Sequence, residues 1–262
     1  MCIIIKTILK IGVTNLSFHR IAASLVANTL LEMGFNVERE YAPHQENFER
    51  LKSGQVDMLA SAWLPSSHGI YKIDVEKEVP LLELGLHYKP YALWGVPKYI
   101  SEEITEVSDL LEPEVLSKMK KDIQGINSGA GITRFSIEMM EAYGLNAAGY
   151  KFHTGTEDDC FSAFENAVAH KQWMVVPLWK PQFLHYKYNI RELKEPKGLL
   201  GIIDKAVLLL REDKKDLFTD AQLKKLDGLH FTNDIIAELD YQVSREGKDI
   251  DEVTKNWLQN QS

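Results

Sequence analysis

The sequence has few cysteines and no excess of basic residues, and each scarcity excludes a class of protein. Only two of its 262 residues are cysteine, Cys2 and Cys160. No Cys-x-x-Cys motif or Cys/His ligand spacing accompanies them, so we expect neither a disulfide framework nor a structural zinc site. The net charge of -8 argues against nucleic acid or an anionic membrane as a partner, since both require clustered lysine and arginine.

Long apolar runs are also missing. No run of about 18 apolar residues occurs, so a membrane-spanning helix is not expected. Residues 1–10 contain no sustained apolar segment and no small-residue cleavage site, which predicts that the printed chain carries no export signal. No such signal precedes Cys2, which is accordingly not expected to be a lipid anchor.

The N-terminal third of the chain alternates between strand and helix patterns. Residues 8–13, 35–41 and 56–60 are typical of strands, and residues 19–33 place apolar side chains at helical spacing. Alternation of this kind predicts parallel strands connected by helices. Ligands of such sheets bind beyond the carboxyl ends of the strands.

The middle of the chain repeats this pattern. Residues 122–126 and 173–178 read as strands, and helices are expected after Gly131 and over 158–171. Residues 205–210 form a strong strand pattern, which helices beginning near Thr219, Asn233 and Asp249 follow.

We therefore expect an α/β protein with two lobes, each a mostly parallel sheet flanked by helices. Lobe 1 comprises residues 1–92 and 206–262, and lobe 2 is the inserted segment 93–205. Segments near 86–96 and 198–210 would then form a hinge.

The loop from Ser61 to His68 is the first candidate binding site. Pro65 ends the preceding strand because proline has no N–H to donate. Trp63 offers an aromatic face to a cationic group, and His68 offers an imidazole to an anionic group. This pair suits a small ligand with a cationic head and an anionic tail. The alternative is a packed tryptophan and a surface histidine.

Two further stretches add candidates. Gly129-Ala130-Gly131-Ile132 opens a helix, where unpaired N–H groups and the positive end of the dipole suit an anion. The stretch lacks the third glycine of a dinucleotide fingerprint and the lysine of a P-loop, so no nucleotide is expected. Trp179 follows another strand beside Pro181. It either faces Trp63 across a cleft or packs within its own lobe.

Catalysis is only weakly indicated. Cys160 lies near a predicted helix start, where the dipole lowers a thiol pKa, but its acidic neighbours oppose this effect and favour a buried small side chain. Neither Gly-x-Ser-x-Gly nor His-Glu-x-x-His occurs. We expect no catalytic residue, cofactor or metal site. The histidines considered for metal binding, none with a convincing ligand spacing, are His19, His44, His153, His170, His185 and His230.

Four stretches together point to one family: Trp63-Leu64-Pro65-Ser66-Ser67-His68, Gly129-Ala130-Gly131-Ile132, Trp179-Lys180-Pro181 and Leu193-Lys194-Glu195-Pro196-Lys197-Gly198. The chain resembles the glycine-betaine/proline-betaine/choline substrate-binding proteins of ABC importers, most clearly from Ile11 to about residue 200. The resemblance implies a two-lobed periplasmic-binding-protein fold of type II, which binds its ligand in the cleft between the lobes.

The resemblance also implies which residues bind. Trp63 and Trp179 match the tryptophan cage around the trimethylammonium group. His68 and the backbone amides of Gly131 and Ile132 match the groups that hold the carboxylate of a betaine.

The sequence departs from the family pattern at one wall of the cage. A further cage tryptophan of several members matches Leu16 here, with Phe18 two positions on. Losing one cation–π partner removes about 1–2 kcal/mol of binding free energy, which is enough to change the preferred ligand.

The expected function is capture of a quaternary ammonium compound, namely glycine betaine, proline betaine, choline or carnitine. The protein would be a non-enzymatic monomer in the periplasm or on the outer face of the cell membrane, and it would deliver this ligand to an ABC permease. Three alternatives remain: a different small zwitterion, because of Leu16; an enzyme that uses Cys160; and a cytoplasmic sensor module, because of the absent export signal.

Overall fold

The computed structural model describes residues 8–261 and divides the chain into two compact units. Unit 1 comprises the chain up to Pro90 and again from Asp204 onward, and unit 2 is Tyr91–Ile203. The boundaries predicted after residues 92 and 205 lie close to these positions. Cys2 lies outside the described residues. Within residues 8–261, no helix is both long enough and apolar enough to cross a bilayer.

Unit 1 contains a five-stranded sheet in the order β2-β1-β3-β10-β4. Strand β1 pairs in parallel with β2 and β3, whereas β10 pairs antiparallel with β3 and β4. The strands are β1 (Ile8–Thr14), β2 (Asn36–Ala42), β3 (Met58–Leu64), β4 (Leu81–Tyr88) and β10 (Lys205–Arg211).

The expectation of a mostly parallel sheet therefore holds for β2-β1-β3 and is wrong for β10. The cause is the insertion of unit 2 after β4. The backbone N–H of Asp204 donates to the Pro90 carbonyl oxygen at 2.8 Å, so the chain returns to unit 1 where it left. A strand that starts beside the end of β4 must run against it.

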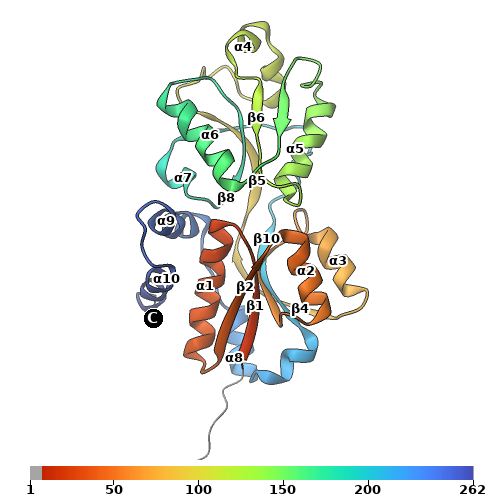
Figure 1. Ribbon diagram of the computed structural model, residues 1–262, viewed down its shortest axis with the longest axis vertical. Coiled ribbons are helices and arrows are strands. Elements are labelled where there is room, and N and C mark those ends of the chain that lie inside the picture. Colours follow the sequence, from red (N-terminus) through yellow and green to blue (C-terminus); the bar gives the residue numbers. More distant parts are fainter. Residues whose placement is uncertain (1–7, 262) are drawn as a thin grey trace, which may run out of the picture. The chain divides into compact units, whose positions relative to one another are not determined.

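Helices cover both faces of the unit 1 sheet. Helix α1 lies on one side of the sheet in Figure 1 and α2 and α3 lie on the other, with α9 and α10 outside α1. The helices of unit 1 are α1 (Ser17–Glu32), α2 (His44–Ser53), α3 (Gly69–Glu76), α8 (Asp220–Asp227), α9 (Asn233–Ser244) and α10 (Ile250–Gln259), with a 3₁₀ helix at Glu212–Leu217.

Each face of this sheet has its own apolar core. The α1 face buries Met58, Ala60, Leu208 and Leu210 against α1 residues such as Val26. The opposite face buries a second set of strand residues against Phe48 and Leu51 of α2, and these strand residues are Leu59, Ala62, Leu64, Val207 and Leu209. Burial of apolar area on both faces stabilises the unit at about 25 cal/mol per Å².

Unit 2 contains an antiparallel sheet, β8-β5-β9, and a short parallel pair, β6-β7. The expectation of a mostly parallel sheet is wrong for β8-β5-β9, whose strand pairs are antiparallel, and holds only for β6-β7. The strands are β5 (Tyr91–Pro97), β6 (Asp122–Gln124), β7 (Lys151–His153), β8 (Val176–Lys180) and β9 (Ile190–Leu193). The helices are α4 (Pro113–Lys118), α5 (Gly131–Ala142), α6 (Glu157–Ala169) and α7 (Leu184–Lys187), with a 3₁₀ helix at Val107–Leu111.

Candidate functional site

A β-bulge in β3 sets the direction of the side chains at the candidate site. Leu59 pairs with Leu209 of β10 and Ala62 pairs with Val207, so three steps along β3 match two steps along β10. The extra residue accompanies a positive φ of 60° at Ser61. Bulges re-aim side chains in this way next to functional sites. Here the bulge shifts the alternation by one residue and turns Trp63 to the α1 face.

Trp63 is held in a buried aromatic group on that face. Its ring centroid lies 5.1 Å from that of Phe18 and 5.2 Å from that of His19. Its Nε1–H donates to the hydroxyl oxygen of Tyr88 at 3.0 Å. Burial raises the pKa of Tyr88 far above its ordinary value, so this hydroxyl keeps its proton. The indole is therefore fixed at its polar edge by a neutral phenol.

His68 is locked into one orientation by the loop that carries it. The backbone N–H of Trp63 donates to His68 Nδ1 at 3.0 Å, and the backbone N–H of His68 donates to the Trp63 carbonyl oxygen at 2.8 Å. A nitrogen that accepts a hydrogen bond carries no proton, so the ring proton of His68 is on Nε2. The side chain thus presents a donor suited to an anion.

Asp204 holds the same loop in place by hydrogen bonds. Its carboxylate accepts from the backbone N–H groups of Ser66 and Ser67 at 2.6 and 3.0 Å, and from the Ser67 hydroxyl at 2.7 Å. The carboxylate is almost fully buried. The loop between Trp63 and His68 is therefore shaped by a residue that lies far away in the sequence.

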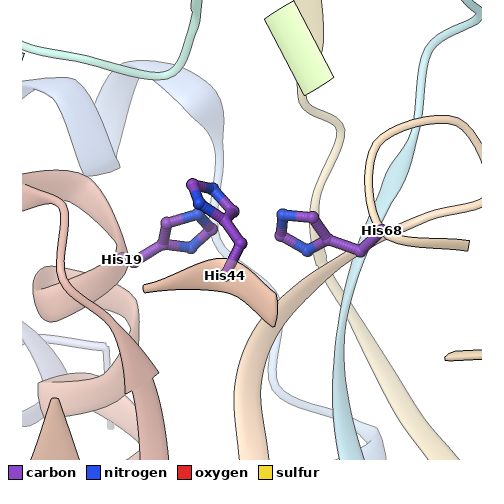
Figure 2. Close-up of side chains that lie close together, drawn as sticks. All are labelled: His19, His44 and His68. Atoms are coloured by element: carbon purple, nitrogen blue, oxygen red, sulfur yellow. The ribbon is translucent and has the colours of Figure 1, made fainter. Parts of the chain in front are cut away.

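Three histidines of unit 1 converge beside Trp63. Each of His19, His44 and His68 offers a ring nitrogen, and the three nitrogens lie within 4.8 Å of one another. Figure 2 shows the three imidazoles grouped together. Burial lowers the pKa of His19 well below its ordinary value, and His44 lowers it further. Sequence spacing did not reveal this cluster, because its members come from the start of α1, the start of α2 and the loop before α3.

The two residues at the expected missing wall lie at the start of α1. Leu16 occupies the N-cap position with an extended backbone and offers no side-chain cap. Phe18 is buried against Trp63. The first turn of α1 therefore places the phenyl ring of Phe18 beside Trp63, next to the imidazole of His19.

In unit 2, the Gly129–Ile132 stretch ends in the first turn of α5. Ala130 is the N-cap and provides no side-chain hydrogen bond, and Gly131 and Ile132 are the first residues of the helix. N–H groups in a first helical turn have no partner within their own helix. The positive dipole end of a helix suits an anionic group, and the first residues of α5, Gly131 and Ile132, are buried.

Trp179 lies in β8 of unit 2 and is buried there. Trp179 pairs with Ala92 of β5 in the sheet, and the centroid of its indole ring lies 5.8 Å from that of the Phe161 ring. The adjacent Lys180 forms an ion pair with Glu192 at 2.8 Å. Trp94, in the same sheet, is buried and donates from Nε1 to the Ser136 hydroxyl at 2.8 Å. These contacts fix both indoles within unit 2.

Cys160 is fully buried in α6, with Sγ 3.6 Å from the Pro177 carbonyl oxygen. Burial raises the pKa of its thiol far above the ordinary value, and the nearby Glu157 and Asp159 raise it further. A thiol in this state is a poor nucleophile.

Solved structures of substrate-binding proteins share this fold. Lactococcal OpuAC in its closed form with glycine betaine aligns with a TM-score of 0.84 at 24% identity, covering 98% of this chain and 96% of that one. The glycine betaine/L-proline-binding protein ProX of Borrelia burgdorferi also has a TM-score of 0.84 at 24% identity, covering 97% and 93% of the two chains. An ABC-transporter choline-binding protein in complex with choline has a TM-score of 0.82 at 14% identity, covering 97% and 88%. The expected type II fold of periplasmic binding proteins is confirmed.

The sequence comparison then defines the family. Residues 7–260 match the family described as the substrate binding domain of the ABC-type glycine betaine transport system, and the chain belongs to this family. The glycine betaine/carnitine transport binding protein GbuC of Listeria monocytogenes serotype 1/2a (strain 10403S) is 26% identical over 138 residues. That match covers 53% of this chain and 45% of the Listeria protein, so it spans less than half of that relative.

Proposed function

We propose that this protein captures a quaternary ammonium compound and delivers it to an ABC permease. The observation that carries the proposal is the buried pair at the end of β3, where Trp63 and His68 are 6% and 2% exposed. Trp63 is an aromatic surface for a cation, and His68 presents an N–H to an anion. The family match and the names of its relatives support glycine betaine, choline and carnitine as ligands to test. Proline betaine is a fourth ligand to test, because the sequence resemblance includes it.

The proposal assigns residues of both units to one ligand. Trp63 and Trp179 bind the cationic head, and Phe18 takes the place of the aromatic wall that Leu16 lacks. His68 and the amides of Gly131 and Ile132 bind the anionic tail. Segments 86–96 and 198–210 act as a hinge that closes when the ligand binds the closed state better.

The chemistry at Cys160 supports a binding protein without enzymatic activity, because a buried thiol with a raised pKa is held in its unreactive form. We further propose that the protein acts as a monomer, without nucleic acid, in the periplasm or on the outer face of the cell membrane. Because Leu16 stands where several family members have a cage tryptophan, a differently shaped small zwitterion is the second candidate ligand.

Calorimetric titration tests the ligand class. The purified chain is titrated with glycine betaine, proline betaine, choline and carnitine under the same buffer conditions. We expect saturable binding of one ligand to one chain for at least one compound. Absence of binding to all four would refute the quaternary ammonium proposal.

Two substitutions then separate the ends of the ligand. Trp63→Ala should weaken every quaternary ligand by about tenfold or more, since it removes a cation–π partner. His68→Ala should weaken carboxylate-bearing ligands about 10- to 100-fold and choline much less, because it removes a hydrogen bond to a charged group. Trp257→Ala in α10 and His230→Ala are the matched controls and should change neither. Equal losses for both ligand classes in His68→Ala would contradict its assigned role.

A further inference from the structure

A continuous chain of hydrogen bonds joins Trp63 to His19 inside unit 1. Trp63 Nε1–H donates to the Tyr88 hydroxyl oxygen at 3.0 Å, the Tyr88 and Ser61 hydroxyls bond to each other, and Ser61 Oγ lies 2.7 Å from His19 Nδ1. All four side chains are almost completely buried. Water is therefore not the ordinary partner of these groups. Each donor and each acceptor among them must find its hydrogen-bond partner within the protein.

The chemistry of the first member sets the direction of the whole chain. An indole N–H can only donate, so the Tyr88 oxygen accepts from it and the Tyr88 proton goes to Ser61. The Ser61 hydroxyl then donates to His19 Nδ1. The reverse order would leave the Tyr88 proton without an acceptor in a buried place. Because His19 Nδ1 accepts, the ring proton of His19 is on Nε2.

The backbone holds Ser61 where this order requires it. The bulge in β3 gives Ser61 a φ of 60°, a conformation that a serine adopts only where its surroundings enforce it. In that conformation its hydroxyl reaches both His19 and Tyr88. The strain in β3 and the hydrogen-bond chain thus serve the same side chain.

His19 and His68 consequently adopt the same tautomer. Each accepts at Nδ1 from a group of the protein, Ser61 for His19 and the Trp63 backbone N–H for His68. Each therefore carries its proton on Nε2, and their ring centroids are 5.8 Å apart (Figure 2). A metal ion needs the unprotonated nitrogen of its ligand. Two Nε2–H groups are donors, and donors in a cluster suit an oxyanion.

We propose that His19 is a second imidazole donor to the anionic group of the ligand, alongside His68, and that Tyr88 and Ser61 are positioning residues that keep its proton on Nε2. This inference rests on the proposed function. A carboxylate has two oxygens and accepts from both histidines, whereas the single hydroxyl of choline has one oxygen. The site therefore selects quaternary ammonium carboxylates over quaternary ammonium alcohols.

A pair of substitutions at His19 tests the donor. His19→Asn keeps a short side chain that accepts from Ser61 but has no group at the Nε2 position, and His19→Gln places an N–H there again. We expect His19→Asn to weaken glycine betaine about tenfold and choline less than about threefold. His19→Gln should recover part of the glycine betaine affinity. His230→Asn is the matched control outside the site, and a thermal melt verifies that each variant is folded.

Nitrogen-15 NMR of histidine-labelled wild-type protein tests the bonding order without any substitution. We expect the Nε2–H tautomer for both His19 and His68. In Tyr88→Phe the Ser61 hydroxyl loses its fixed direction, so His19 should shift toward the Nδ1–H tautomer and glycine betaine should bind more weakly. A tautomer of His19 with the proton on Nδ1 in the wild type would overturn the inference.

The outcomes separate this inference from the proposed function. Wild-type protein that binds none of the quaternary ligands would refute the proposed function and with it the inference. Two outcomes would refute only the role of His19. In the first, His19→Asn leaves the affinity for glycine betaine unchanged. In the second, it lowers the affinities for glycine betaine and choline by the same factor. Stoichiometric Zn²⁺ binding by the wild type that His19→Asn abolishes would also overturn it, because a metal would then use the lone pair that the inference assigns to a proton.

Discussion

At the scale of the residue, His87 shows what burial does to a histidine without hydrogen bonds. It lies in β4 where two extra residues interrupt the pairing with β10, and neither ring nitrogen has a hydrogen-bond partner within the described part of the chain. Its ring packs 5.5 Å from that of Phe231. Burial lowers the pKa of His87 to about 4, and the nearby His230 lowers it further. The ring is therefore neutral in the folded protein at physiological pH.

This gives the protein an acid-sensitive stability. His87 takes up its proton near its ordinary pKa of 6.5 when unfolded but near 4 when folded. Between these values the unfolded chain binds more protons, so the free energy of unfolding falls as the pH falls from 6.5 to 4. The pKa difference corresponds to a loss of about 3 kcal/mol over that range.

Urea unfolding of wild type and His87→Leu at several pH values between 7.5 and 4.5 measures this contribution. Leucine fills a similar volume and does not titrate, so we expect the variant to lose less stability on acidification. His170→Gln, at an exposed position in unit 2, is the control. The same pH dependence in wild type and His87→Leu would contradict the assignment.

Some residues of the candidate site could be predicted from the sequence and others could not. Trp63 lies near the end of β3 and His68 lies in the loop that follows, only five positions further on. The sequence therefore predicted that they lie close together, and their ring centroids are 6.2 Å apart in the structure. His19 and His44 belong to other elements, and only the fold brings them within 4.8 Å of His68. No local pattern marks such a cluster, because each member satisfies the pattern of its own helix.

At the scale of the element, the loop between β3 and α3 depends on Asp204. Its carboxylate receives three hydrogen bonds from Ser66 and Ser67. Asp204 sits just before β10, and the pairing of β10 with β3 carries it to the loop. The position of His68, at the end of this loop, is therefore set by strand pairing as well as by its own sequence.

We predict that Asp204→Ala lowers both stability and ligand affinity. The substitution removes the acceptor of three hydrogen bonds, two of them from the buried Ser67, which costs about 2–4 kcal/mol of stability. Ligand affinity should fall as well, because the loop no longer holds His68 in one orientation. Chemical unfolding and calorimetric titration with glycine betaine measure the two effects. Asp213→Ala, an exposed aspartate paired with Arg211, is the control, and equal behaviour of the two variants would refute the anchoring role.

Elements with strong local signals were predicted well. Helix α1, helices α5 and α6, and strands β1, β2 and β10 lie within a few residues of their expected ranges. Thr156 and Thr219 cap their helices through reciprocal side-chain bonds, which is a local interaction. Strand β9 and helix α3 were not expected. Both are short, and each is stabilised by packing on neighbours that are distant in sequence.

At the scale of the whole molecule, unit 2 is an insertion with its own core. Its principal sheet consists of β5, β8 and β9, all within Tyr91–Ile203. The side chains that fill this core include Trp94, Phe161, Phe164 and Leu178, each almost completely buried. A contiguous segment that contains all strands of its sheet and an apolar core has what a domain needs to fold alone.

We therefore predict that a fragment of residues 91–203 folds without unit 1. Its far-UV circular dichroism should show a mixed α/β spectrum, and its thermal transition should be cooperative. The amide NMR spectrum should be well dispersed, and the full chain serves as the reference. A broad, non-cooperative melt of the fragment would show that unit 2 depends on unit 1 for its stability.

The sequence by itself determined the family, the helices and strands with strong local patterns, and the loop that carries Trp63 and His68, because each of these is encoded in contiguous residues. The tertiary structure decided the antiparallel course of β10, the bulge that turns Trp63 toward α1, and the bonding order from Trp63 through Tyr88 and Ser61 to His19. The physical reason is that a hydroxyl or an imidazole can either donate or accept, and the groups packed around it determine which it does. In this protein the partners lie on β3, β4 and α1, and only the folded chain brings them together.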